Sequence, residues 1–222
     1  MRVLILGATG PSGILIVKEF FRAYPDGSAA LYVRNPSKIP SELSSIPAIT
    51  VIQGGLTDSQ ALASAFKSGG QIDAVVSALG PVPPFGGNPI TEAYRTIIPI
   101  MATNGCKRFI ALSTYSHPDP RDKFSILNWL MVTTVWLLIG TAQRDILTYS
   151  PLIMEECDKH DIDWTLVRVP ILTMKEGQRT VAGYIGDGKV GVILSRVAAA
   201  EFFVKAIEGK EWVRKAPSLS SQ

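Results

Sequence analysis

The sequence predicts a single α/β domain, in which helices flank a doubly wound parallel sheet. Short apolar runs, as expected for strands buried on both faces, alternate with helical patterns along the chain. Hydrophobic residues make up 46% and charged residues 18% of the 222 residues, which supplies a large core and excludes a disordered chain. No linker or internal repeat divides the chain, so we assign residues 1–215 to one domain and 216–222 to a flexible tail.

The first half of the chain is predicted to alternate strands with helices. The unbroken apolar run at its start indicates a buried strand, and Pro25-Asp26-Gly27 ends the helix that follows. Asp58 stands near the start of a second, amphipathic helix. Strands are expected at 2–6, 29–33, 50–53 and 72–78, and helices at 14–24 and 58–67.

The second half continues the same alternation after a loop at 79–89, which is rich in glycine and proline. Pro99 lies inside the next helix, where its missing N–H group predicts a kink or a break. Ser195 is the expected N-cap of the last helix, and Gly209 follows its end. Helices are expected at 90–104, within 124–160 and at 196–208, strands at 109–113 and 164–169, and extended pieces around 181–185 and 190–194.

A glycine-rich turn connects the first strand to the first helix. Gly7, Gly10 and Gly13 follow the apolar run and precede the helix directly, with the spacing GxxGxxG. Such a turn lets a diphosphate approach the free N–H groups of the helix N-terminus, where the helix dipole favours negative charge. The third glycine allows helix and strand to pack closely. The turn therefore predicts a Rossmann-type domain that binds a dinucleotide.

The end of the second strand distinguishes the two nicotinamide cofactors. An acidic residue there binds the ribose 2′-hydroxyl of NAD, whereas an arginine accepts the 2′-phosphate of NADP. This chain has Arg34 at that place, Lys38 close behind it, and no carboxylate. Because a guanidinium matches phosphate with two hydrogen bonds, the sequence favours NADP(H).

The chain resembles the atypical short-chain dehydrogenases with NmrA-like, NAD(P)H-binding domains. The resemblance covers nearly the whole chain and rests on VLILGATGPSG (3–13), VRNPSK (33–38), DAVVSALG (73–80), IDWTLVRVP (162–170) and LSRVAAA (194–200). It implies the fold and the cofactor, but it leaves the activity open, because the family includes reductases, isomerases and redox sensors.

The resemblance also implies a role for individual residues along the bound cofactor. Those at the phosphate and adenine end are Thr9, Gly10, Pro11 and Ser12 around the diphosphate, Arg34 at the 2′-phosphate and Leu56 against the adenine. Those at the nicotinamide end are Ser77, Ala78 and Leu79 along the ribose and ring, Ser113 and Thr114 facing the reacting carbon, and Pro170 and Ile171 over the carboxamide.

The catalytic pattern of short-chain dehydrogenases is incomplete here. Such enzymes carry a Tyr-x-x-x-Lys pair, in which the lysine lowers the pKa of the proton-donating tyrosine. Tyr94, Tyr115 and Tyr149 are each followed four residues later by a residue other than lysine. Ser113, Tyr115 and His117 remain the candidates for proton transfer, and of these we assign Ser113 and Tyr115 as catalytic. A loop anchor is the alternative role of Tyr115. Hydride transfer needs no protein acid, since solvent can supply the proton.

The cysteines, the histidines and the net charge argue against a metal site, a redox cysteine pair and nucleic-acid binding. Cys106 and Cys157 match no metal or redox spacing and are expected to be buried free thiols in a reducing, cytoplasmic compartment. We expect His117 to be a solvated loop residue and His160 to be structural, and neither has metal-ligand companions. The net charge of +3 is small and its charges are scattered, which makes nucleic acid an unsuitable partner.

An apolar stretch at 124–142 contains no charged residue. As a helix it would measure about 28 Å, but spanning a membrane would pull two strands of one sheet to opposite sides. Three roles stay open for this stretch: docking on a membrane surface, covering a lipophilic substrate pocket, and forming a homodimer interface. The substrate-side elements are expected at about 114–143 and 170–194.

Three functions follow as alternatives. The first is an NADPH-dependent reductase of a bulky apolar carbonyl or enone, such as a secondary metabolite. The second is an isomerase or cyclase on the same fold, and the third is a dinucleotide sensor that binds a partner protein.

Overall fold

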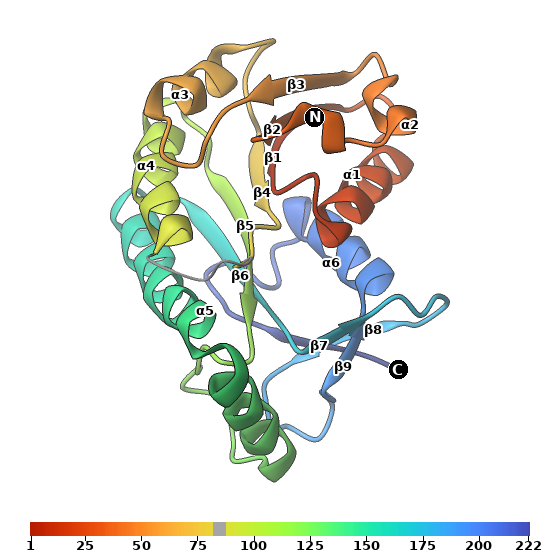
Figure 1. Cartoon of the computed structure of the whole chain (residues 1–222), viewed down its shortest axis with the longest axis vertical. Helices are drawn as coiled ribbons and strands as arrows, with labels where there is room; N and C mark the ends of the chain where they lie inside the picture. Colours follow the sequence, from red (N-terminus) through yellow and green to blue (C-terminus); the bar gives the residue numbers. More distant parts are fainter. Residues whose placement is uncertain (82–87) are drawn as a thin grey trace.

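The computed structural model describes residues 1–81 and 88–222, and its centre is an eight-stranded sheet (Figure 1). The strand order is β3-β2-β1-β4-β5-β6-β10-β8, and all neighbours are parallel except β10 and β8. The strands are β1 (Arg2–Leu6), β2 (Ser28–Val33), β3 (Ile49–Gln53), β4 (Ala74–Ser77), β5 (Arg108–Thr114), β6 (Asp163–Val169), β8 (Thr180–Gly183) and β10 (Ser218–Ser221). A separate two-stranded sheet pairs β7 (Ile171–Thr173) with β9 (Ile193–Ser195).

Helices cover both faces of the large sheet. They are α1 (Pro11–Ala23), α2 (Ser41–Ser44), α3 (Ser59–Lys67), α4 (Pro89–Thr103), α5 (Ile126–Lys159) and α6 (Arg196–Glu208), with a short 3₁₀ helix η1 (Pro36–Lys38). In Figure 1, α3, α4 and α5 lie on one side of the sheet, and α1 and α6 on the other. This arrangement confirms the predicted single-domain α/β fold of Rossmann type.

Two cores fill the space between the sheet and its helices. On the side of α4 and α5, the buried rings of Tyr94, Phe109 and Tyr149 meet edge to face at centroid distances of 5.4 and 5.5 Å. On the side of α1 and α6, Phe20 and Phe203 are buried against the other face. Both faces of the central strands are thus covered, which explains why β1 is an unbroken apolar run.

The parallel register places several strand ends at one edge of the sheet. Leu6 pairs with Tyr32 of β2 on one side and with Ser77 of β4 on the other, and Thr114 pairs with Val169. The carboxyl ends of β1, β2, β4, β5 and β6 therefore face the same way. In such sheets, ligands bind outside this edge.

Several predicted elements differ in detail from the structure. The first helix begins at Pro11, because a proline is well tolerated at the first helical position. The helix that contains Pro99 is not broken there. The short helices η1 and α2 fall in a stretch for which nothing was predicted. Residues 82–87 of the predicted loop lie outside the described residues.

The end of the chain corrects the prediction of a flexible tail at 216–222. Residues Ser218–Ser221 form β10, which lies between β6 and β8, and Leu219 is fully buried. The segment is short and polar, and its pairing partners are remote in sequence, so its local pattern does not indicate a strand. Cys106 and Cys157 are buried free thiols, and burial raises the pKa of Cys106 to about 12.

Helix α5 contains the apolar stretch and continues well beyond it. It is one helix of 34 residues, and its N-terminal half extends past the body of the molecule at the lower end of Figure 1. Among the residues that the structure describes, no helix has the length and apolar character needed to cross a membrane.

Candidate cofactor site

The glycine turn lies where β1 ends and α1 begins. Gly7 has a φ of +75°, and a Cβ at this position would lie 2.9 Å from the carbonyl carbon of Ala78. A Cβ on Gly13 would overlap the carbonyl oxygen of Gly7. The packing of the turn against β4 and α1 therefore requires glycine at both positions.

Gly10 faces open space instead. A Cβ there would meet no described atom closer than the carbonyl oxygen of Gly7, at 3.5 Å, and its φ of −82° suits any residue. Gly10 is the N-cap of α1, and no side chain within the described residues caps this helix. The free space and the uncapped N-terminus of a 13-residue helix suit an anionic group such as a diphosphate.

Arg34 and Lys38 lie at the same edge of the sheet as the turn. Arg34 directly follows β2, in which Tyr32 pairs with Leu6 of β1. Its side chain is exposed, as is that of Lys38, which lies in η1 behind the N-cap Asn35. Arg34 thus follows the end of the strand next to β1, and Lys38 comes four residues later.

The residues that end β4 adjoin the turn on its other side. A Cβ on Gly7 would lie 3.1 Å from the backbone nitrogen of Leu79, so Ala78 and Leu79 pass directly beside it. The hydroxyl of Ser77 is turned toward α4, where it lies 2.7 Å from the hydroxyl of Tyr94. It is therefore the backbone of Ser77, Ala78 and Leu79 that lies beside the turn.

The end of β5 presents Ser113 and Thr114. Ser113 is buried, and its hydroxyl lies 2.9 Å from the hydroxyl of Ser150 on α5. The hydroxyl of Thr114 accepts a hydrogen bond of 3.2 Å from the backbone N–H of Ser116. Both residues lie at the carboxyl edge of the sheet, where they pair with Arg168 and Val169 of β6.

Tyr115 uses its hydroxyl to hold the loop after β5 in place. The hydroxyl lies 2.8 Å from the carbonyl oxygen of Gly191 and 2.7 Å from that of Leu219, so these two acceptors share its one proton. Burial raises the pKa of Tyr115, although the charge of Arg168 opposes this effect. The geometry thus favours the loop-anchoring role of Tyr115 over that of a proton donor.

His117 is buried, which corrects the expectation of a solvated loop residue. Its carbonyl oxygen accepts a hydrogen bond of 3.1 Å from Arg168, which is fully buried and forms an ion pair of 2.6 Å with Asp122. Burial lowers the pKa of His117, and the nearby positive charge of Arg168 lowers it further. His117 belongs to the network that fixes the loop. His160 lies 3.7 Å from Glu156 at the end of α5.

The other predicted cofactor residues lie near the same edge. Leu56, after β3, is partly buried and packs against the core beneath α3. Pro170 joins β6 to β7, and Ile171 follows it with an exposed side chain. The structure places these residues just after strand ends.

Arg196 is a site residue that the sequence analysis missed. It is the first residue of α6, and its guanidinium donates a hydrogen bond of 2.8 Å to the hydroxyl of Ser12. The N-termini of α1 and α6 therefore meet, and a cation stands between them. The Leu194-Ser195-Arg196 segment marked the helix start, but nothing in the sequence indicated that it reaches the glycine turn.

A sequence comparison identifies the family. The profile of a family described as NAD(P)H-binding matches residues 7–210, which includes the turn and both arginines. The chain belongs to this NAD(P)H-binding family. No curated protein matches the chain.

Solved structures resemble this NAD(P)H-binding protein along its whole length. A short-chain dehydrogenase/reductase from Veillonella parvula in complex with NADP has a TM-score of 0.77 and 15% identity, covering 99% of this chain and 94% of that one. ChuY, an anaerobillin reductase from Escherichia coli, has a TM-score of 0.75 and 16% identity, covering 99% and 97%. A Bacillus halodurans protein, described as an NAD-dependent epimerase/dehydratase without an established activity, has a TM-score of 0.72 and 20% identity, covering 100% and 94%. At these identities the likeness shows the fold.

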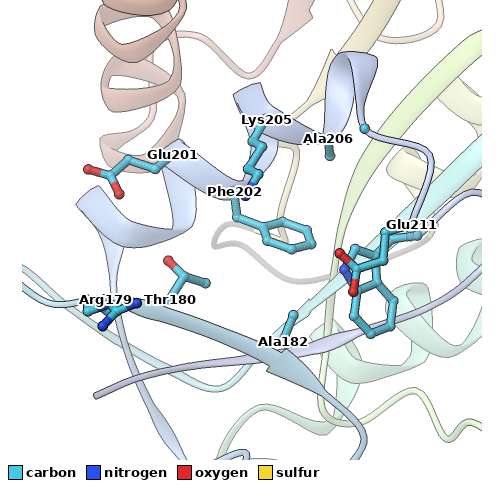
Figure 2. A pocket seen from close by; sticks show the side chains of 10 residues that line it. Arg179, Thr180, Ala182, Glu201, Phe202, Lys205, Ala206 and Glu211 are labelled. Atoms are coloured by element: carbon cyan, nitrogen blue, oxygen red, sulfur yellow. The ribbon is translucent and has the colours of Figure 1, made fainter.

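A pocket of about 440 Å³ lies away from the predicted cofactor residues of this NAD(P)H-binding protein, between α6 and β8 (Figure 2). In Figure 2 the ring of Phe202 points from α6 toward Ala182 of β8. The charged side chains that line it are two cations and two carboxylates, namely Arg179, Lys205, Glu201 and Glu211. This balance gives no preference for an anionic cofactor. Within residues 1–81 and 88–222, no cluster of three or more His, Cys, Asp or Glu side chains could hold a metal ion.

Proposed function

We propose that this protein is an NADPH-dependent reductase of a bulky apolar carbonyl or enone, such as those of secondary metabolism. The observation that carries the proposal is that the glycine turn, Arg34 and Arg196 stand together at the carboxyl edge of the sheet. The NADP bound by the related Veillonella parvula protein is consistent with this choice.

Each part of the site would bind a different part of NADP(H). The N-terminus of α1 and Arg196 would hold the diphosphate, because both offer donors and positive charge beside the open space at Gly10. Arg34, with Lys38, would bind the 2′-phosphate. Ser77, Ala78, Leu79, Ser113, Thr114, Pro170 and Ile171 would line the ribose and nicotinamide.

The surroundings of the nicotinamide end suit an apolar substrate. Ile171, Met174 and Ile193 expose their side chains on β7, the following loop and β9, which lie past the strand ends. A bound nicotinamide supplies the hydride. The hydroxyl of Ser113 is paired with Ser150, and that of Tyr115 with two carbonyls, so we assign the proton to solvent.

Calorimetric titration with NADPH and NADH tests the cofactor assignment. The native chain is expected to bind NADPH more tightly than NADH, and Arg34→Ala is expected to weaken NADPH binding about 10- to 100-fold, because a charge-assisted hydrogen bond is lost. The matched control is Arg95→Ala, which removes an exposed arginine on α4 that pairs with Glu92 at 3.6 Å. Equal affinity for both cofactors, unchanged by Arg34→Ala, would contradict the 2′-phosphate assignment.

The reaction is then tested by incubating the protein and NADPH with a panel of apolar enones and monitoring the NADPH absorbance. Consumption of NADPH with a reduced product supports the reductase. Product formation without NADPH consumption would indicate an isomerase or cyclase instead.

A cofactor sensor is the second candidate, and two observations favour it. The chain has no Tyr-x-x-x-Lys pair, and the described hydroxyls at the end of β5 already have partners. Tight NADPH binding without turnover of any enone, together with cofactor-dependent binding to a partner protein, would favour the sensor.

A further inference from the structure

The N-terminal half of α5 exposes large apolar side chains that the cofactor site does not use. We define the apolar segment as residues 124–137. It projects beyond the rest of the molecule at the lower end of Figure 1. Its large exposed side chains are Phe124 (83%), Ile126 (66%), Leu127 (54%), Trp129 (56%), Leu130 (51%), Trp136 (60%) and Leu137 (70%).

These side chains cover a broad face of the helix. Successive helical residues are rotated by roughly 100°, so Ile126, Leu130 and Leu137 lie on one line along the helix. Trp129 and Trp136 lie together on one flank of this line, and Leu127 lies on the other. The exposed apolar side chains thus span about half the circumference, which is wider than the seam by which two helices pair.

The charges at both ends of the segment are positive. Lys123 and Arg144 are exposed, and no charged residue lies between them. The neighbouring carboxylates are turned into the protein: Asp122 pairs with Arg168 at 2.6 Å, and Asp145 is buried and accepts three hydrogen bonds. The apolar face is therefore bounded by exposed cations, whereas the acidic neighbours of these cations have partners inside the protein.

We propose that the apolar segment docks this protein on an anionic membrane surface, with the N-terminal part of α5 lying in the interface. Tryptophan is enriched at the level of lipid headgroups, and the segment carries two on one flank. Cations at both ends complement anionic lipid headgroups. A homodimer through this face would place cation near cation in either helix orientation, which is unfavourable.

Vesicle binding of the full chain tests the proposal. The native protein is expected to sediment with vesicles of an equal mixture of phosphatidylcholine and phosphatidylglycerol, less with phosphatidylcholine alone, and less at high salt. Its tryptophan fluorescence is expected to shift to shorter wavelength on binding. Leu137→Ser is expected to weaken binding about tenfold while both tryptophans remain as reporters. Each of Lys123→Gln and Arg144→Gln is expected to weaken it about fivefold.

The matched control is Leu147→Ser, which removes an exposed leucine from the same helix outside the segment and is expected to leave vesicle binding unchanged. Circular dichroism of each variant checks that the fold is retained. Equal binding to both vesicle compositions, or binding that Leu137→Ser does not weaken, would overturn the proposal. A second result would also overturn it: the native chain does not bind vesicles but forms a dimer in sedimentation velocity, and Leu137→Ser dissociates this dimer. A second copy of the chain would then cover the apolar face.

Discussion

Arg196 contacts Ser12 across 184 positions of sequence, and this contact leads to a prediction about the diphosphate. Replacing Arg196 by Ala is expected to weaken NADPH binding about tenfold, because a cation beside the helix N-terminus is lost. Binding of adenosine 2′-monophosphate is expected to be unchanged, since this ligand has the 2′-phosphate but no diphosphate. Calorimetry, with competition titration for the weaker ligand, measures both.

Arg34→Ala provides the comparison, because it is expected to weaken the binding of both ligands. If Arg196→Ala weakens the binding of adenosine 2′-monophosphate as much as that of NADPH, Arg196 stabilises the fold of the turn and does not bind the diphosphate. Arg196→Lys retains the charge and is expected to restore part of the affinity.

The glycine turn could be predicted from local spacing, whereas contacts between residues that are distant in sequence could not be predicted. Gly7, Gly10 and Gly13 recur at every third position, and their role follows from the strand before them and the helix after them. The acceptors of the Tyr115 hydroxyl lie 76 and 104 residues away, so its anchoring role became visible only in the folded chain. Arg196 was missed for the same reason.

At the scale of elements, Asp145 on α5 caps α4. Its carboxylate accepts hydrogen bonds from the backbone N–H groups of Ile90 and Thr91, at 3.2 and 3.1 Å, and from the Thr91 hydroxyl at 2.6 Å. Asp145→Ala is expected to lower the free energy of unfolding by about 2–4 kcal/mol, because buried donors at a helix N-terminus lose their acceptor. Urea denaturation measures the change.

The exposed ion pair of Lys18 and Glu42, at 2.6 Å, offers a control for this prediction. Glu42→Ala removes a carboxylate that solvent already screens and is expected to cost less than about 1 kcal/mol. If Asp145→Ala costs no more than Glu42→Ala, Asp145 does not stabilise the junction of α4 and α5.

The elements themselves were largely predictable, because each apolar run or helical pattern is local. The exceptions depend on tertiary structure. Pro99 does not break α4, which is packed against α3 and α5 and tolerates the lost hydrogen bond. The segment Ser218–Ser221 is short and polar, and it forms a strand because its backbone pairs with both β6 and β8.

At the scale of the whole molecule, the last strand links the loop after β5 to the sheet. The backbone of β10 lies between β6 and β8, and the carbonyl oxygen of Ala216 accepts a hydrogen bond of 2.8 Å from the buried Arg168. Arg168 in turn holds Asp122 and the carbonyl of His117 in the loop after β5. The same terminal segment also provides Leu219, whose carbonyl anchors Tyr115.

A chain that ends at Lys215 is therefore expected to lose more than about 4 kcal/mol of its free energy of unfolding, since it lacks a buried strand and one of the acceptors of the buried Arg168 guanidinium, the carbonyl of Ala216. The point variant Leu219→Ala keeps the strand and its backbone bonds, and it is expected to cost about 3 kcal/mol through the cavity it leaves. Urea denaturation of both chains separates the two contributions. A shortened chain that unfolds at the native urea midpoint would show that residues 216–222 are a dispensable tail after all, whereas graded losses would show that the last strand completes the sheet and holds the loop beside the cofactor site.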